Sequence, residues 1–212
     1  MQTKENWEQV YQTKAPDTVS WFQVHAEHSL QFIHSTGVNH DGPIIDVGGG
    51  ASTLVDDLLK EGYHSLSVLD ISGAALNAAK KRLGVLKEKI QWIEADVTRV
   101  SLPEAYYDIW HDRAVFHFLI LAEDRSAYIE LVKRSVKSGG HVIIATFAED
   151  GPSKCSGLPI VRYTANELQT ELGASFILTR YEKKAHYTPL GNVQQFLYCC
   201  FTNVGGLIDA EL

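Results

Sequence analysis

Short apolar runs of strand length alternate with amphipathic segments of helical length through the middle of this chain. The apolar runs predict strands at 43–47, 65–70, 89–95, 106–111 and 141–147. The amphipathic segments predict helices at 52–62, 72–84 and 122–140, each ending at a glycine. Strands separated by helices are typical of βαβ units, and the apolar run HVIIATF suits the middle of a parallel sheet.

Both ends of the chain depart from this alternation. Two strand-like runs, 175–184 and 194–203, have no helix between them, which predicts a hairpin forming an antiparallel edge on an otherwise parallel sheet. Residues 5–36 have a helical pattern and carry Trp7, Tyr11 and Trp21. This segment is expected to pack on the sheet as a lid, and it could also close a ligand site.

Length and composition indicate one α/β domain of 212 residues. We expect a helical lid (1–40), a core (43–147) and a loop with the terminal hairpin (148–203). A net charge of −7 argues against nucleic-acid binding, because that function needs clustered Lys and Arg. No apolar run is long enough to span a membrane, no export segment is evident, and the three cysteines form no disulfide framework. A cytoplasmic protein, monomeric or homodimeric, is expected.

The segment IIDVGGGAST, residues 44–53, combines a buried strand with a glycine turn at the start of a helix. Glycines at this place let the backbone approach a ligand closely. The dinucleotide fingerprint is incomplete, because Thr53 occupies the position of its last glycine. No Tyr-x-x-x-Lys pair supports hydride chemistry, and no Gly-Lys-Ser/Thr supports a P-loop.

An acid lies at the end of three successive strands: Asp46, Asp70 and Asp96. An acid like Asp70, 20 residues after Gly50, commonly meets ribose hydroxyls. A carboxylate directly before the glycines would repel a pyrophosphate but could accept from an ammonium group. The pattern therefore favours a positively charged nucleoside over one that bears phosphates.

At this point the sequence resembles the class I S-adenosylmethionine-dependent methyltransferases over nearly its whole length. The resemblance implies a Rossmann-like, mostly parallel seven-stranded sheet with an antiparallel C-terminal hairpin, helices on both faces and S-adenosylmethionine as methyl donor. Ser52 stands at the family's usual third glycine. The implied donor contacts are the methionine part at Asp46 and at Gly48, Gly49 and Gly50, the ribose at Asp70, and the adenine at Ile71, Asp96 and Val97.

The resemblance extends to the N-terminal aromatic residues, which cover the donor in several members of the class. Trp21 could therefore attract the sulfonium by a cation–π interaction, or it could simply anchor the lid. His111, in the fourth strand, is a candidate for contacts beside the donor.

The segment IWHDRAVFHFLILAEDR, 109–125, would carry the acceptor-side residues. It is similar to the matching segment of thiopurine S-methyltransferases and of some lysine methyltransferases, which have Asp-Arg or Asp-Lys followed by a small residue, here Asp112, Arg113 and Ala114. His117 is the candidate general base, with Asp112 beside it in the candidate catalytic set. The alternative for His117 is a core histidine. A metal site at His111, Asp112 and His117 lacks an evident fourth ligand, and no metal is expected.

These features predict an enzyme that transfers a methyl group by in-line displacement to the O, N or S atom of a small molecule. Two alternatives stay open: methylation of a protein lysine, and a scaffold that binds a nucleoside without turnover.

Overall fold

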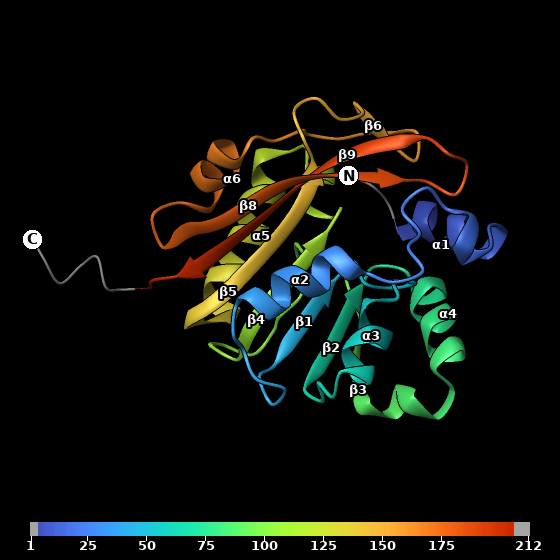
Figure 1. The fold of residues 1–212 in the computed structure, drawn as a ribbon, viewed down its shortest axis with the longest axis horizontal. Helices are drawn as coiled ribbons and strands as arrows, with labels where there is room; N and C mark the ends of the chain where they lie inside the picture. Colours follow the sequence, from blue (N-terminus) through green and yellow to red (C-terminus); the bar gives the residue numbers. More distant parts are fainter. Residues whose placement is uncertain (1–3, 206–212) are drawn as a thin grey trace, which may run out of the picture.

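The computed structural model describes residues 4–205, so the outermost residues of the predicted domain, 1–3 and 206–212, lie outside the described residues. Seven strands form the main sheet: β1 (Ile44–Val47), β2 (Leu66–Asp70), β3 (Ile90–Glu94), β4 (Tyr107–Arg113), β5 (Val136–Phe147), β8 (Phe176–Tyr187) and β9 (Val193–Asn203). Their order across the sheet is β3-β2-β1-β4-β5-β9-β8 (Figure 1). A separate two-stranded sheet contains β6 (Lys154–Cys155) and β7 (Leu158–Pro159).

The pairing confirms the predicted mixed sheet. β1 pairs in parallel with β2 on one side and β4 on the other, and β4 pairs in parallel with β5. β9 is antiparallel to both β5 and β8. The carboxyl ends of β1, β2, β3 and β4 therefore meet at one edge, where ligands bind in folds of this kind.

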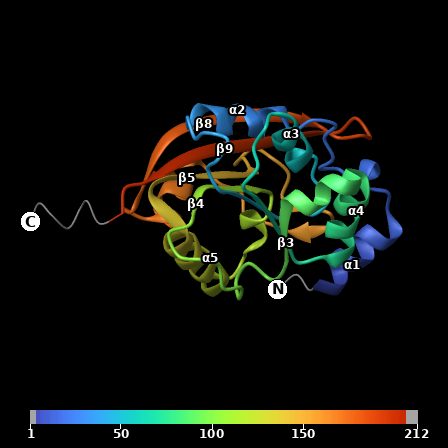
Figure 2. The same cartoon turned by 90° about the horizontal axis from the view of Figure 1, so that it is seen from below.

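Helices cover both faces of the sheet. They are α1 (Lys4–Thr13), α2 (Glu27–Ser35), α3 (Leu54–Lys60), α4 (Gly73–Leu83), α5 (Ala122–Ser135) and α6 (Ala165–Leu172), with 3₁₀ turns η1 (Pro16–Thr18), η2 (Gly84–Lys89) and η3 (Phe116–Phe118). Apolar side chains of α2, α3 and α4 join one core, and those of α5 and α6 join the other. Figure 2 shows the sheet between these two layers. Cys199 and Cys200 point into opposite cores, as adjacent residues of a strand must.

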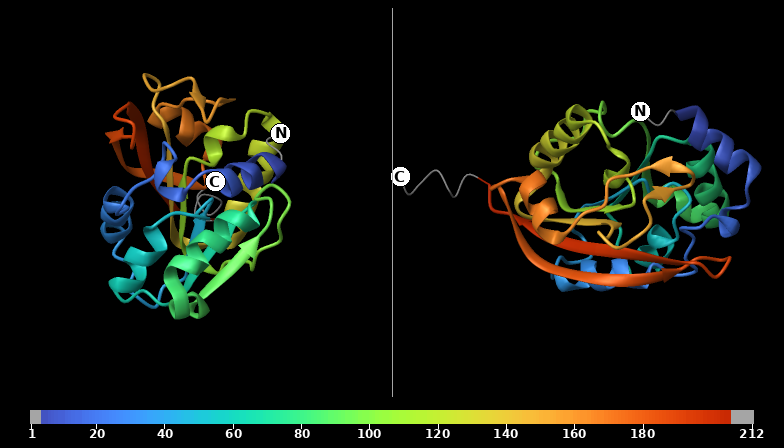
Figure 3. Two further views of the ribbon diagram at one scale, coloured as in Figure 1. Left: turned by 90° about the vertical axis from the view of Figure 1, so that its right-hand side faces the viewer. Right: turned by 90° about the horizontal axis from the view of Figure 1, so that it is seen from above.

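The predicted N-terminal helix is interrupted between residues 13 and 27. α1 ends just before Pro16, and α1 and α2 pack against different parts of the fold (Figure 3). α1 lies beside α4, where the Glu8 carboxylate accepts from the Ala74 amide at 3.3 Å. α2 buries Phe32 and Ile33 against the sheet, so it belongs to a core layer rather than to a lid.

The prediction that a helix runs from 122 to a glycine stop at 140 is wrong over its last five residues, 136–140. α5 ends at Ser135, and Gly139 and Gly140 lie within β5. The carbonyls of Arg134 and Ser135 accept from the amides of Ala105 and Tyr106 in the preceding loop, at 2.8 and 2.9 Å. Tertiary contacts thus end the helix before its local pattern does.

A buried polar network ties β4 to α5. The Asp112 carboxylate accepts from the Tyr128 hydroxyl at 2.7 Å and from the amides of Val115 and Phe116 at 2.8 and 3.0 Å. The Trp110 indole nitrogen donates to the same Tyr128 hydroxyl at 2.8 Å. Burial raises the pKa of Asp112 to about 6 despite these donors. The network holds the turn η3 against the end of β4.

We expect Tyr128→Phe to lower the free energy of unfolding by about 1–3 kcal/mol, because it removes one donor to the buried Asp112 carboxylate and leaves the Trp110 indole donor without its partner. Urea unfolding followed by circular dichroism measures this change. Tyr187→Phe, at a side chain that is 70% exposed, is the matched control and should change little. Equal midpoints for Tyr128→Phe and the unsubstituted protein would contradict a stabilising role of the network.

Candidate functional site

Two adjoining cavities lie at the carboxyl edge of the parallel strands. The main cavity encloses about 1100 Å³, counting its open mouth, between the ends of β1, β2 and β4, residues 95–98, α1 and the turn η3. The side cavity encloses about 560 Å³ between the glycine turn and residues 16–29. Five residues line both cavities: Tyr11, Trp21, Val47, Gly48 and Arg113.

The glycine turn packs directly on two buried carboxylates. Gly48 has φ +69°, and a Cβ there would lie 2.1 Å from Val115 Cγ2. A Cβ at Gly49 would lie 2.2 Å from Asp46 Oδ2, and one at Gly50 would lie 2.5 Å from Asp70 Oδ2. Of the three, Gly48 lines both cavities, Gly49 lines the side cavity, and Gly50 lines neither. Gly49 and Gly50 therefore make room for the acids, while Gly48 makes room for Val115.

Asp46 has one partnered and one free oxygen. His111 Nδ1 lies 2.7 Å from Asp46 Oδ1, and His111 Nε2 lies 2.9 Å from the Ser29 hydroxyl. Asp46 Oδ2 is buried without a hydrogen-bond partner, and both Asp46 and His111 line the side cavity. A carboxylate oxygen left free in this way is suited to a cationic donor such as an ammonium group.

Asp70 is fixed at the end of β2 by two backbone amides. Gly50 N donates to its Oδ2 at 2.9 Å and Ser72 N donates to its Oδ1 at 2.8 Å. Burial raises the pKa of Asp70 to about 6 against the effect of these donors. Asp70 and the adjacent Ile71 line the main cavity.

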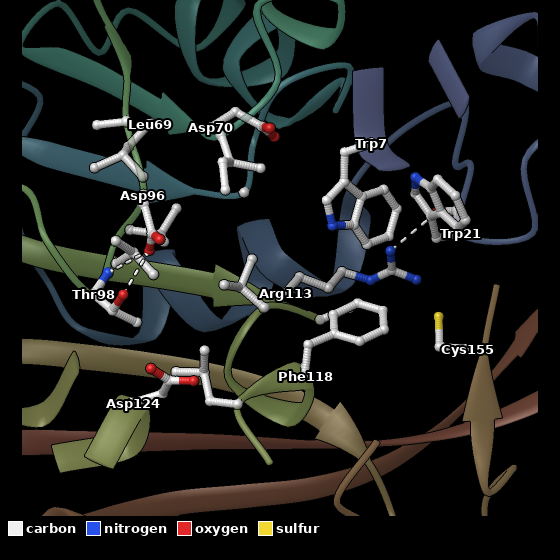
Figure 4. Close-up of a pocket in the computed structure, with 18 of the residues that line it drawn as sticks. Trp7, Trp21, Leu69, Asp70, Asp96, Thr98, Arg113, Phe118, Asp124 and Cys155 are labelled. Carbon is white, nitrogen blue, oxygen red and sulfur yellow. Dashed lines mark hydrogen bonds between the residues drawn. The ribbon is translucent and has the colours of Figure 1, made fainter. Parts of the chain in front are cut away.

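Asp96 and Val97 line the same cavity after β3. The Thr98 amide and hydroxyl donate to Asp96 Oδ1 at 2.9 and 2.7 Å, which orients the carboxylate. Figure 4 shows Asp96, Thr98 and Asp124 at one end of the cavity and Trp21, Arg113 and Cys155 at the other. The strand-end acids predicted from the sequence thus meet around adjoining cavities.

Aromatic side chains of the N-terminal segment cover the main cavity. Trp7 packs edge-on against Trp21 and Phe118, with ring centroids 5.8 and 5.4 Å apart. The Trp21 indole donates to the Tyr11 hydroxyl at 3.2 Å, and burial raises the pKa of Tyr11. Trp21 lines both cavities, and its contact with the donor stays a prediction.

Arg113, the last residue of β4, lies where the two cavities meet. Its Nε donates to the Tyr198 hydroxyl and its Nη1 to the Trp21 carbonyl, both at 3.0 Å. Its guanidinium carbon lies 4.4 Å from the centroid of the Phe196 ring. Nη2 is buried without a partner, so one donor remains for a ligand.

Asp112 and His117, the two predicted catalytic residues, line neither cavity. Asp112 belongs to the network with Tyr128. His117 is fully buried, accepts from the Phe147 amide at 3.3 Å, and has a pKa lowered to about 3, chiefly by burial and then by Arg113. This environment favours the alternative of a core histidine.

Sequence reasoning missed several residues of the cavity wall, notably Phe118, Gln194 and Phe196. Phe118 follows His117 in the segment considered above. The other two lie in β9, and only the pairing of β9 with β5 places them near the end of β4. Cys155 also lines the main cavity, where burial raises its pKa to about 12.

Within residues 4–205, no group of three or more His, Cys, Asp or Glu side chains is placed to hold a metal ion. In the same part of the chain, each helix is too short or too polar to cross a bilayer.

Comparisons with known proteins agree with this fold. A family model described as a methyltransferase domain matches residues 45–144. A curated mouse (Mus musculus) protein, eEF1A lysine and N-terminal methyltransferase, is 21% identical over 137 residues, which are 65% of this chain and 19% of that protein.

Two solved structures share the fold at low sequence identity. One, described under the conversion of a disulfide bond into a thioacetal group during echinomycin biosynthesis, has a TM-score of 0.78 and 13% identity, covering 98% of this chain and 95% of the other. The second is 1,6-didemethyltoxoflavin-N1-methyltransferase of Burkholderia thailandensis with bound S-adenosylhomocysteine, at TM-score 0.69 and 16% identity, covering 94% and 86%. The family match over residues 45–144 and the sheet order show a methyltransferase domain with the class I fold, and the strand-end acids lie at the edge where this fold binds ligands.

Proposed function

We propose that this enzyme methylates a small molecule bound in the main cavity. One observation carries the proposal: aromatic side chains of the N-terminal segment and of η3 turn the acceptor side of the strand edge into a covered cavity. An acceptor bound there would be held in place by the cavity wall and separated from water. The cavity would thus position the reacting atoms and exclude hydrolysis.

The donor is assigned to the acids at the strand ends. Asp46, oriented by His111, would accept from the ammonium group of S-adenosylmethionine through its free Oδ2. Asp70 would accept from the ribose hydroxyls, and Asp96 from the adenine amino group.

Other parts of the proposed donor site make apolar or backbone contacts. Ile71 and Val97 would contact the adenine, while the turn Gly48–Gly50 would lie along the methionine part. Trp21 would face the sulfonium, where the negative face of its ring attracts a cation. The bound donor supplies a methyl group activated by the positive charge on sulfur.

Neither Asp112 nor His117 enters the proposed mechanism as a base. A general base must lie within hydrogen-bond reach of the acceptor, directly or through one water, and both residues are buried outside the cavity lining. Positioning and exclusion of water are the contributions that the cavity can make.

A protein acceptor is the second candidate, supported by the similarity to the mouse eEF1A lysine and N-terminal methyltransferase. The positive charge at the acceptor end of the main cavity favours a small-molecule acceptor instead. Arg113 has a free donor there, and its positive charge would oppose a lysine ammonium.

Radiolabelled methyl transfer into a fractionated extract tests this proposal. We expect label from S-adenosylmethionine in the small-molecule fraction, while the protein fraction stays unlabelled. Label on protein alone would favour the second candidate. Transfer to neither fraction, despite donor binding, would contradict both.

Asp70 gives a prediction about pH. The ribose hydroxyls donate more strongly to an ionised carboxylate, whereas the ligand-free carboxyl has its pKa raised to about 6 by burial, with smaller contributions from Asp46 and Glu8. Binding must therefore release a proton below that pH, so the affinity for S-adenosylhomocysteine should rise as pH increases through about 6. Calorimetry in buffers of different ionisation enthalpy measures the affinity and the released proton.

Asp70→Asn should weaken the binding of S-adenosylhomocysteine by about 1–3 kcal/mol and remove this pH dependence. Asp41→Asn, at an exposed position, is the control. A pH profile that is the same in Asp70→Asn and the unsubstituted enzyme would refute the assignment of Asp70.

Asp46 is tested by comparing two ligands. Asp46→Asn should weaken S-adenosylhomocysteine, which carries the amino-acid part, but should leave 5′-methylthioadenosine, which lacks it, nearly unchanged. Calorimetric titration of both ligands measures the difference. An equal loss for the two ligands would indicate a general disturbance of the glycine turn rather than a lost ammonium contact.

A further inference from the structure

The guanidinium of Arg113 is a positive charge without a countercharge. Its contacts within residues 4–205 are a hydroxyl, a carbonyl and the face of a phenylalanine ring, and no carboxylate pairs with it. Nη2 is buried and makes no hydrogen bond. Burying a charged donor without a partner is costly, so such a group is normally satisfied by a ligand.

Asp46 lines the side cavity together with Arg113, but it is bonded to His111 and forms no ion pair with the guanidinium. The positive charge of Arg113 affects the pKa of three neighbouring groups: His117 in η3, Cys155 in β6 and His186 in β8. Burial lowers the pKa of both histidines and raises that of the thiol, and Arg113 lowers all three. Near neutral pH these neighbours are therefore uncharged. The acids Asp96 and Asp124 lie at the opposite end of the cavity (Figure 4).

Aromatic rings make up much of the cavity wall near Arg113. Phe196 lies under the guanidinium, and Phe118 and Trp7 pack together in the same cavity wall. Gln194 adds a second polar atom, because its buried side-chain oxygen also lacks a partner. Such a lining suits an aromatic molecule that carries one polar, negatively charged group.

We propose that Arg113 is the specificity-determining residue of the acceptor subsite, and that the acceptor is a small aromatic acid, a thiol, phenol or carboxylic acid, which reacts as its anion. This inference rests on the proposed function. Arg113 Nη2 donates to the anionic atom or group, and the ring lies among Phe118, Phe196 and Trp7.

The transfer step balances without a protein base. A lone pair of the acceptor anion forms a bond to the methyl carbon, while the electron pair of the carbon–sulfur bond goes to sulfur. A negative acceptor and a positive sulfonium become a neutral methylated product and a neutral thioether. The acceptor's proton has already gone to water, because Arg113 stabilises the ionised form in the cavity.

The same charge balance favours product release. Methylation removes the negative charge that Arg113 binds, so the product loses the interaction that selects the substrate. The enzyme thus discriminates an acid from its own methyl derivative.

Arg113 also borders the side cavity, so the anion could have another source. The carboxylate of the donor's methionine part carries the same charge. Comparing S-adenosylhomocysteine with 5′-methylthioadenosine separates the two sources, since only the first has that carboxylate.

The experiment measures binding of matched pairs to the enzyme–S-adenosylhomocysteine complex by calorimetry at neutral pH. The pairs are 4-nitrophenol with 4-nitroanisole, thiophenol with thioanisole, and benzoate with methyl benzoate. We expect the acid of at least one pair to bind about 10- to 100-fold more tightly than its methylated partner. Arg113→Gln should abolish this preference and Arg113→Lys should keep part of it.

Arg180→Gln is the matched control. This arginine also stacks on a phenylalanine, 4.3 Å from the centroid of the Phe32 ring, but it lines neither cavity. It should retain the full preference. Because the comparison within each pair uses the unsubstituted enzyme, the test does not depend on the stability of the variants.

Equal affinity for acid and methyl derivative in every pair would overturn the inference. So would a loss in Arg113→Gln confined to S-adenosylhomocysteine and absent for 5′-methylthioadenosine, which would assign the guanidinium to the donor. These outcomes differ from a failure of the proposed function, in which the unsubstituted enzyme transfers no labelled methyl group to any small molecule.

Discussion

Two carboxylates buried beneath a glycine turn are the constraint on which the site depends. Asp46 and Asp70 lie so close to the turn that side chains at Gly49 and Gly50 would collide with them. Gly50 N is hydrogen-bonded to Asp70, and His111 is hydrogen-bonded to Asp46. Moving either carboxylate would therefore leave its partner without this hydrogen bond. Burying such groups destabilises the free protein, and hydrogen bonds only partly offset that cost. Under the proposed donor assignment, a bound nucleoside with donor groups and a positive charge would offset that cost.

Successive side chains at the end of β4 point to opposite faces of the sheet. One of them therefore stabilises the core, while the next lines the cavity. Asp112 points into the core, where it holds η3 and α5 through Tyr128. Arg113, the next residue, points the other way and reaches the cavity. Ala114 follows with φ +72°, a conformation that a small residue tolerates better than a bulky one, and turns the chain into η3. One dipeptide therefore both anchors the floor of the site and supplies its free positive charge.

This division explains what could be predicted from the sequence. The positions of the strands and of the strand-end acids follow from hydrophobic period and spacing, which are local properties, whereas the seven-stranded sheet is implied by the family resemblance. The role of His117 does not follow from spacing, because a histidine in an apolar run can face a cavity or the core, and only packing against Phe147 decides. Nor could the glycines at 139–140 reveal that β5 had already begun. The capping box of Thr164 and Glu167, in contrast, is a local sequence signal for the start of α6.

The distribution of charge along the main cavity also sets how two reactants can lie in it. Acids occupy the end formed by β2 and residues 95–98, and the free guanidinium occupies the end formed by β4 and β9. A cationic donor is drawn toward the acids and repelled by Arg113, so its sulfonium is best accommodated between the two ends. An anion bound at Arg113 reverses that repulsion. The donor would then be most stable in the reactive position only when an ionised acceptor is present, so that acceptor binding and donor alignment stabilise each other.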